Sequence, residues 1–168
     1  LDQEPSVESA LLSYETPSGY VRSMIGGRDP RISEFNRAVQ AKRQPGSAFK
    51  PIVYTAALDK GYTPASIIID SPVIGSLEGV PDKWKPKNYG GHFAGPTTFH
   101  KALTESRNIV SIKILRDIGV DYAAGYARRF GVESPLNLDL SLALGSSAIS
   151  LEELVRAFGV FPGGGVRP

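Results

Sequence analysis

The sequence predicts an α+β fold, because the signals for strands and for helices occupy different parts of the chain. Residues 7–14 and 20–25 have the composition of two strands joined by a turn. Apolar segments of helical length follow, several of them bounded by capping or stop residues. These segments are 47–60, 98–105, 109–118, 121–130 and 151–160.

The two N-terminal strands are predicted to form a hairpin. Residues 16–19 (Thr-Pro-Ser-Gly) have the chemistry of a turn, and the Gly26-Gly27 pair ends the second strand. Residues 28–46 are polar and irregular. Residues 61–97 are rich in proline and glycine, so we expect mostly loop there, with a short strand at 67–69. A loop of that length inside a compact domain is often functional.

The helix boundaries follow from local chemistry. Side chains that accept hydrogen bonds from free N–H groups mark helix starts, and glycines mark helix ends. The expected caps are Thr97 or Thr98, Asp121, and a capping box of Ser150 with Glu153. The expected stops are Gly61, Gly119 and Gly131. The 47–60 segment is apolar nearly all round, which predicts a helix at the centre of the core.

Composition excludes several classes of function. The chain has 168 residues and a formal net charge of +2, with its basic residues scattered, so we expect about one domain and no nucleic-acid partner. Cysteine is absent, and His92 and His100 have no partner at metal-ligand spacing, so no metal site and no cofactor is expected. No apolar run reaches transmembrane length. Any anchor or export signal is expected to lie outside these residues.

Ser47 and Lys50 are the first candidate site. They stand at positions i and i+3 at the start of the predicted 47–60 helix, so both side chains can point to one face. A serine hydroxyl is a weak nucleophile until a base takes its proton. A lysine can be that base if burial lowers its pKa from about 10.4. The pair therefore fits a serine nucleophile activated by a lysine, although Ser-x-x-Lys alone also fits an ordinary surface lysine.

The residues around Ser47 favour the catalytic interpretation. The Pro45-Gly46 pair breaks the chain just before the serine, and 52–58 continues as an apolar helix. Pro51 falls in the first turn, where its missing N–H costs least. The serine is thus expected at the mouth of a buried helix.

Ser106 and Asn108 form a second candidate site. Residues two apart on a continuous helix point in different directions, so the two side chains face one site only if the backbone turns between the helices. The apolar register shifts between Leu103 and Ile109, which permits such a break. A serine there can relay a proton, and an asparagine can hold a substrate amide. A polar helix–helix junction is the alternative.

These motifs, with longer stretches around them, resemble the penicillin-recognising serine enzymes, whose signature includes Ser-x-x-Lys, Ser-Asp-Asn and Lys-Thr-Gly. The sequence is similar to the transpeptidase domain of class A penicillin-binding proteins over nearly its whole length. The stretches that carry the resemblance are 10–12, 26–29, 35–38, 40–47, 84–89, 95–98 and 142–147.

The resemblance implies a D,D-transpeptidase that cross-links peptidoglycan stem peptides and is acylated by β-lactams. By the family's pattern, Ser47 is the nucleophile, Lys50 its base, and Ser106 the residue that passes a proton to the leaving group. Asn108 matches the contact to the substrate amide, and Arg107 occupies the variable middle position. The family works at the extracytoplasmic face of the bacterial inner membrane, in the periplasm.

The resemblance also implies a helical lobe beside an antiparallel sheet. We expect all five predicted helices, including 151–160, to form this lobe. The Lys-Thr/Ser-Gly motif is absent, and in the family it lies on a later strand that also supplies an oxyanion-hole N–H. We therefore expect 1–168 to be the N-terminal part of the domain, with an incomplete sheet. The later strands, a glycosyltransferase domain and a membrane anchor would lie outside this chain. An exposed sheet edge would then favour self-association.

Two alternatives share the same motifs. A serine β-lactamase would use Glu133, which stands in a Glu-x-x-Leu-Asn stretch (133–137), to activate the water that releases the acyl group. An exposed loop glutamate is the competing interpretation of this residue. A β-lactam sensor, which is acylated and never turns over, is the other alternative.

Overall fold

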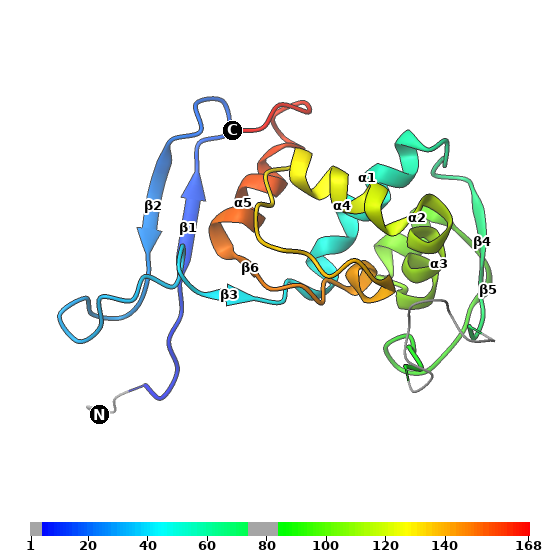
Figure 1. Cartoon of the computed structure of the whole chain (residues 1–168), viewed down its shortest axis with the longest axis horizontal. Coiled ribbons are helices and arrows are strands. Elements are labelled where there is room, and N and C mark those ends of the chain that lie inside the picture. Colours follow the sequence, from blue (N-terminus) through cyan, green and yellow to red (C-terminus); the bar gives the residue numbers. More distant parts are fainter. Residues whose placement is uncertain (1–4, 74–83) are drawn as a thin grey trace. The chain divides into compact units, whose positions relative to one another are not determined.

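The computed structural model describes residues 5–73 and 84–168. The loop expected at 61–97 therefore includes a stretch, 74–83, that lies outside the described residues. The chain divides into two compact units (Figure 1). The hairpin unit comprises Leu1–Arg43, Phe130–Ser134 and Ala148–Pro168, and the helical unit comprises Gln44–Arg129 and Pro135–Ser147.

The expected N-terminal hairpin is confirmed. Strand β1 (Leu11–Tyr14) pairs antiparallel with β2 (Val21–Ile25), and an irregularity between Ser13 and Tyr14 shifts the register. Both strands are shorter than predicted, because the residues before Leu11 and at the turn leave the ladder. Helix α5 (Leu151–Gly159) packs against β1 in the same unit.

The position of α5 corrects one expectation. We expected 151–160 to join the other helices, but the helix belongs to the hairpin unit. It begins with the predicted capping box of Ser150 and Glu153, next to a short pairing of β3 (Lys42–Arg43) with β6 (Ile149–Ser150). Burial favours a raised pKa for Glu153, but hydrogen bonds from the Ser150 N–H and from the 133–134 segment outweigh it and lower the pKa to about 2.

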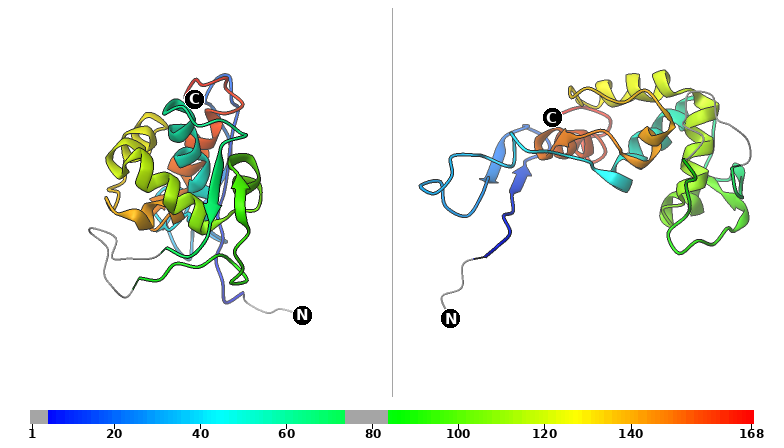
Figure 2. Two further views of the ribbon diagram at one scale, coloured as in Figure 1. Left: turned by 90° about the vertical axis from the view of Figure 1, so that its right-hand side faces the viewer. Right: turned by 60° about the horizontal axis from the view of Figure 1, so that its bottom comes forward.

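The helical unit is built around α1 (Lys50–Asp59), as predicted. Pro51 lies in the first turn of this helix, where a backbone N–H would have no acceptor within the helix. Gly61 follows the end of the helix and has a positive φ. Helix α1 packs against four helices that follow it in the unit and that lie around it in Figure 2. These are α2 (Phe99–Thr104), α3 (Asn108–Ile118), α4 (Val120–Arg129) and the 3₁₀-helix η2 (Leu140–Leu144). Its fully buried apolar side chains are Ile52, Val53, Tyr54, Ala56 and Ala57.

A small sheet lies beside these helices. Strand β4 (Ile67–Asp70) confirms the predicted short strand, and it pairs antiparallel with β5 (Gly95–Thr98), which the sequence did not predict. Pro96 argues against a central strand, but β5 has a neighbour on one side only among the described residues, so the missing N–H is tolerated. Thr98 then caps α2 by accepting a hydrogen bond from the Lys101 N–H.

One predicted cap is wrong. Helix α4 starts at Val120, so Asp121 lies in its first turn and is not the N-cap. The chain turns into α4 directly from Gly119, whose carbonyl accepts a hydrogen bond from the Ala123 N–H. The Asp121 carboxylate remains favourable there because the N-terminus of a helix carries partial positive charge. No helix of the described residues is long and apolar enough to cross a membrane.

Candidate active site

Ser47 and Lys50 lie at the junction of two helices, and the first of them is tighter than the α-helix expected from residue 47. Residues Gly46–Phe49 form the 3₁₀-helix η1, and Lys50 is the first residue of α1. Side chains at i and i+3 eclipse one another in a 3₁₀-helix. Ser47 is exposed at the first turn, where backbone N–H groups have no acceptor inside the helix. Its hydroxyl and its N–H are therefore both open to a substrate.

A contact between two glycines fixes the start of this segment. Gly46 donates its N–H to the Gly145 carbonyl at 3.3 Å, and both glycines have positive φ angles. A side chain at Gly145 would place its Cβ 2.2 Å from the Gly46 carbonyl oxygen. The close approach of η1 and the end of η2 therefore requires glycine at 145, whereas at Gly46 a Cβ would meet no atom and only the φ of 58° favours glycine. This role of Gly145 was not predicted; the presence of a glycine, which adopts positive φ angles easily, was the one signal for it in the sequence.

The Lys50 ammonium is the centre of the site. Its side chain is 1% exposed, and it donates hydrogen bonds to the Ser106 carbonyl (2.7 Å), the Ser106 hydroxyl (2.9 Å) and the Asn108 Oδ1 (2.7 Å). Burial lowers the pKa of Lys50 to about 8. The structure thus brings Lys50, Ser106 and Asn108 together. No hydrogen bond joins the Ser47 hydroxyl to Lys50 within residues 5–73 and 84–168.

The backbone turn predicted between the two helices is confirmed at Ser106. Its φ of 53° is the one positive value among the described residues other than glycine. Ser106 follows the C-cap of α2: its N–H donates to the Leu103 carbonyl (3.0 Å), and the Arg107 N–H donates to the Ala102 carbonyl (2.8 Å). This pair of bonds is a Schellman motif, in which the left-handed residue is usually glycine. The left-handed turn lets Ser106 and Asn108 reach Lys50 together.

The hydrogen-bond chemistry of these groups allows a proton to move. An ammonium has three donors, and here all three are used. A neutral amine keeps two donors and exposes a lone pair. The Ser106 carbonyl and the Asn108 Oδ1 can only accept, but the Ser106 hydroxyl can also donate. Loss of the Lys50 proton therefore leaves a lone pair that a hydroxyl of Ser106 or Ser47 can face.

Glu133 has an exposed side chain, and its backbone N–H donates to Glu153 at 2.8 Å, as suits a loop residue next to a capping box. Among the described residues, no group of three or more His, Asp or Glu side chains is arranged to hold a metal ion.

Comparison with known proteins defines the class. The family described as the penicillin binding protein transpeptidase domain matches residues 7–166, so the chain belongs to that family. Within it, the chain is similar to penicillin-binding protein 1A of Neisseria gonorrhoeae (47% identity) and of Pseudomonas aeruginosa (43% identity). Each match covers 98% of this chain, and the chain spans about a fifth of the length of these relatives, 21% and 20% respectively.

Solved structures of penicillin-binding proteins agree with this family assignment. The crystal structure of penicillin-binding protein 1A from Haemophilus influenzae has 36% identity and a TM-score of 0.88, over 95% of this chain and 24% of that one. PonA1 from Mycobacterium tuberculosis, at 22% identity and a TM-score of 0.83 over 99% of this chain and 45% of that one, shows the same fold. The predicted α+β class is thus confirmed, with small antiparallel sheets in place of one complete sheet among the described residues. The matching family is described as a transpeptidase domain, and not as a β-lactamase or a sensor.

Proposed function

We propose that this chain carries the nucleophile, the base and part of the substrate site of a peptidoglycan D,D-transpeptidase. The observation that supports this most directly is the buried Lys50 amine, which is held by Ser106 and Asn108 one 3₁₀ turn after an exposed serine. Its pKa of about 8 leaves a useful fraction neutral near physiological pH, as a general base requires. Ser47 is the nucleophile and Lys50 its base.

The reaction is acyl transfer from a stem peptide that ends in two D-alanines. The Ser47 Oγ attacks the carbonyl of the penultimate D-alanine as its proton passes to Lys50. The amide C–N bond then breaks, and Ser106 passes the proton to the departing nitrogen of the terminal D-alanine. An amine of a second stem peptide attacks the resulting ester and releases Ser47. Asn108 holds the substrate amide, and the Ser47 N–H can donate to the oxyanion.

β-Lactams would acylate Ser47 in the same way, because they present a strained amide to the same groups. Residues 1–168 would then be the N-terminal part of a transpeptidase domain in a longer, membrane-anchored protein that works in the periplasm. A Lys-Thr/Ser-Gly strand, a glycosyltransferase domain and the anchor would belong to the remainder of that protein. The short length of this chain relative to its relatives supports this assignment.

Covalent labelling tests the assignment. In the full-length protein, a fluorescent penicillin should label Ser47, and Ser47→Ala should abolish labelling. Lys50→Ala should slow labelling by about 10²–10⁴, the usual contribution of a general base. Peptide mapping that placed the adduct on another serine would contradict the proposal.

Glu133→Gln tests the β-lactamase alternative. Because Glu133 is exposed and bonded through its backbone, the lifetime of the penicilloyl adduct should stay within about threefold of the wild type. That is far below the ~10²–10⁴ expected from loss of a general base. A much longer-lived adduct in this variant would favour the β-lactamase.

A further inference from the structure

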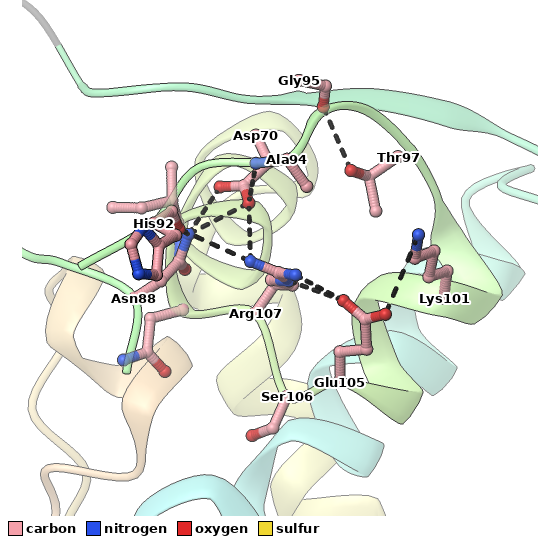
Figure 3. A network of polar contacts seen from close by, with 12 residues as sticks. Asp70, Asn88, His92, Ala94, Gly95, Thr97, Lys101, Glu105, Ser106 and Arg107 are labelled. Atoms are coloured by element: carbon pink, nitrogen blue, oxygen red, sulfur yellow. Dashed lines mark hydrogen bonds and ion pairs between the residues drawn. The ribbon is translucent and has the colours of Figure 1, made fainter. Parts of the chain in front are cut away.

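A buried carboxylate joins three segments of the helical unit next to the site. Asp70, the last residue of β4, is 0% exposed. It accepts hydrogen bonds from the Asn88 Nδ2 (2.8 and 3.0 Å) and the Ala94 N–H (3.0 Å), and the Arg107 guanidinium lies 3.5 Å away (Figure 3). A buried carboxylate is tolerated only when such partners are in place. The 88–94 loop and Arg107 are therefore tied to a fixed point.

Asn88 supplies the cap that α3 lacks. The N-cap of α3 is Arg107, whose side chain makes no capping hydrogen bond. The Ile109 N–H, a free donor of the first turn, is instead accepted by the Asn88 Oδ1 at 3.1 Å. The Nδ2 of the same amide donates to Asp70 and to the His92 carbonyl (2.9 Å). Donors on one side and acceptors on the other fix the orientation of this amide, which is 5% exposed.

This network reaches the Lys50 partners through two short connections. The carbonyl of Lys87, next to Asn88, accepts a hydrogen bond from the Asn108 Nδ2 at 2.9 Å, which turns the Asn108 Oδ1 toward Lys50. Arg107 stands between the two site residues in sequence. Figure 3 shows its guanidinium between Asp70 and Glu105, with the Ser106 side chain pointing away from it.

We infer that Asp70 and Asn88 are positioning residues for the transpeptidase reaction. They set the turn at 106–108, so that the Ser106 hydroxyl and the Asn108 amide meet Lys50. The inference rests on the proposed function and adds residues that do not touch the substrate. Nothing in the local sequence signals this role, because the contacts of Asn88 with Asp70 and with Ile109 span 18 and 21 residues.

The acylation rate and its pH dependence in the full-length protein test the inference. Asn88→Ala should lower the second-order rate constant for benzylpenicillin by about 10–100-fold, since a displacement of about 1 Å can cost 10²-fold. The Lys50 ammonium should also lose acceptors, so its pKa should fall. The acid limb of the pH–rate profile, expected near pH 8 in the wild type, should move to lower pH.

Ile114→Val is the matched control. Ile114 is fully buried in α3 and outside the network, and the change should destabilise the fold modestly, because it removes one buried methyl group. This variant should keep the wild-type acylation rate and acid limb. If Asn88→Ala behaves like the wild type, or if Ile114→Val is slowed as much as Asn88→Ala, the inference is overturned.

A second pair of variants decides the case if Asn88→Ala does not fold. Arg107→Met removes the cation beside Asp70 at a partly exposed position, so the 106–108 turn loses this anchor and acylation should slow about 3–10-fold. Arg107→Lys should recover part of the rate. Wild-type behaviour of Arg107→Met would overturn the inference.

A measurement without turnover separates this inference from the proposed function. If the wild-type protein is not labelled at Ser47, the proposed function fails. An NMR titration of the Lys50 Nζ then still decides the positioning role. A lower pKa in Asn88→Ala supports the role, and an unchanged pKa overturns it.

Discussion

Ser106 places a hydroxyl at a backbone position that proteins usually give to glycine. The left-handed conformation costs a residue with a side chain about 1–2 kcal/mol. Strain of this kind persists where the surroundings enforce it and is often found at functional sites. Here the two Schellman hydrogen bonds at the end of α2 hold Ser106 in the left-handed conformation. This conformation places the Ser106 hydroxyl where it accepts a hydrogen bond from Lys50.

The strain at Ser106 predicts opposite effects on stability and activity. Ser106→Gly and Ser106→Ala both remove the hydroxyl, so both should lose most of the acylation rate. Only glycine relieves the φ of 53°, so the glycine variant should be more stable than the alanine variant by about 1 kcal/mol. Chemical denaturation and penicillin labelling measure the two effects. Equal stability of the variants would show that this turn is not strained.

The lowered pKa of Lys50 predicts a pH dependence of stability. The unfolded lysine titrates near 10.5 and the folded one near 8, so between these values the unfolded state binds more protons. The free energy of unfolding should therefore rise with pH, by up to about 1.4 kcal/mol per unit. The difference between the wild type and Lys50→Met should show this rise from pH 8 to 9.5. Tyr54, whose pKa burial raises to about 12, acts in the opposite direction only above pH 10. A constant difference would contradict a buried, easily deprotonated Lys50.

At the scale of elements, prediction succeeded where the signal is local. The hairpin, the helix at α1, the Thr98 cap and the capping box of α5 each depend on neighbouring residues, and each is confirmed. The two-residue strands β3 and β6 were missed because they exist only through their long-range pairing. Strand β5 was not predicted because it begins with glycine and proline, which are typical of loops, although proline is tolerated in an edge strand.

The glycine contact between η1 and η2 predicts a sharp difference between two similar substitutions. Gly145→Ala would drive a Cβ into the backbone of Gly46 at a φ of +64°, so it should lower stability and displace Ser47. Gly125, in the middle of α4, has open space around its Cα, and Gly125→Ala should be neutral or stabilise by up to about 1 kcal/mol. Thermal unfolding and penicillin labelling of both variants test this. Equal behaviour would show that η1 does not depend on the close approach.

At the scale of the whole molecule, the sequence predicted part of the site and its chemistry. Ser47 and Lys50 could be paired because their spacing is local, and Ser106 with Asn108 because the apolar register breaks between two helices. Asp70 and Asn88 could not be predicted, since their role exists only after β4, the 88–94 loop and α3 have come together. The catalytic roles themselves remain predictions that labelling must test.

The hairpin unit predicts association of the 168-residue chain. Among the described residues β1 and β2 pair only with each other, so each keeps an unpaired edge. Exposed Val21 and Leu11 add apolar surface there. We expect sedimentation to show self-association, or hydrogen exchange to show a poorly protected hairpin, with acylation slower than in the full-length protein. Val21→Lys should reduce association, and Leu58→Lys, at an equally exposed site on α1, should not. A compact monomer with a protected hairpin and full-rate acylation would contradict this expectation.

The capping group of α3 comes from Asn88, and this also constrains the order in which the helical unit can fold. Helix α3 can begin to form on its own within about a microsecond, but the acceptor for its first turn arrives from Asn88, 21 residues upstream. Closing that loop costs chain entropy, so it should follow the collapse of the helices around α1. The Lys50 partners would then be among the last groups of the helical unit to reach their places. A chain emerging from synthesis would have a packed helical core before it could react with its substrate.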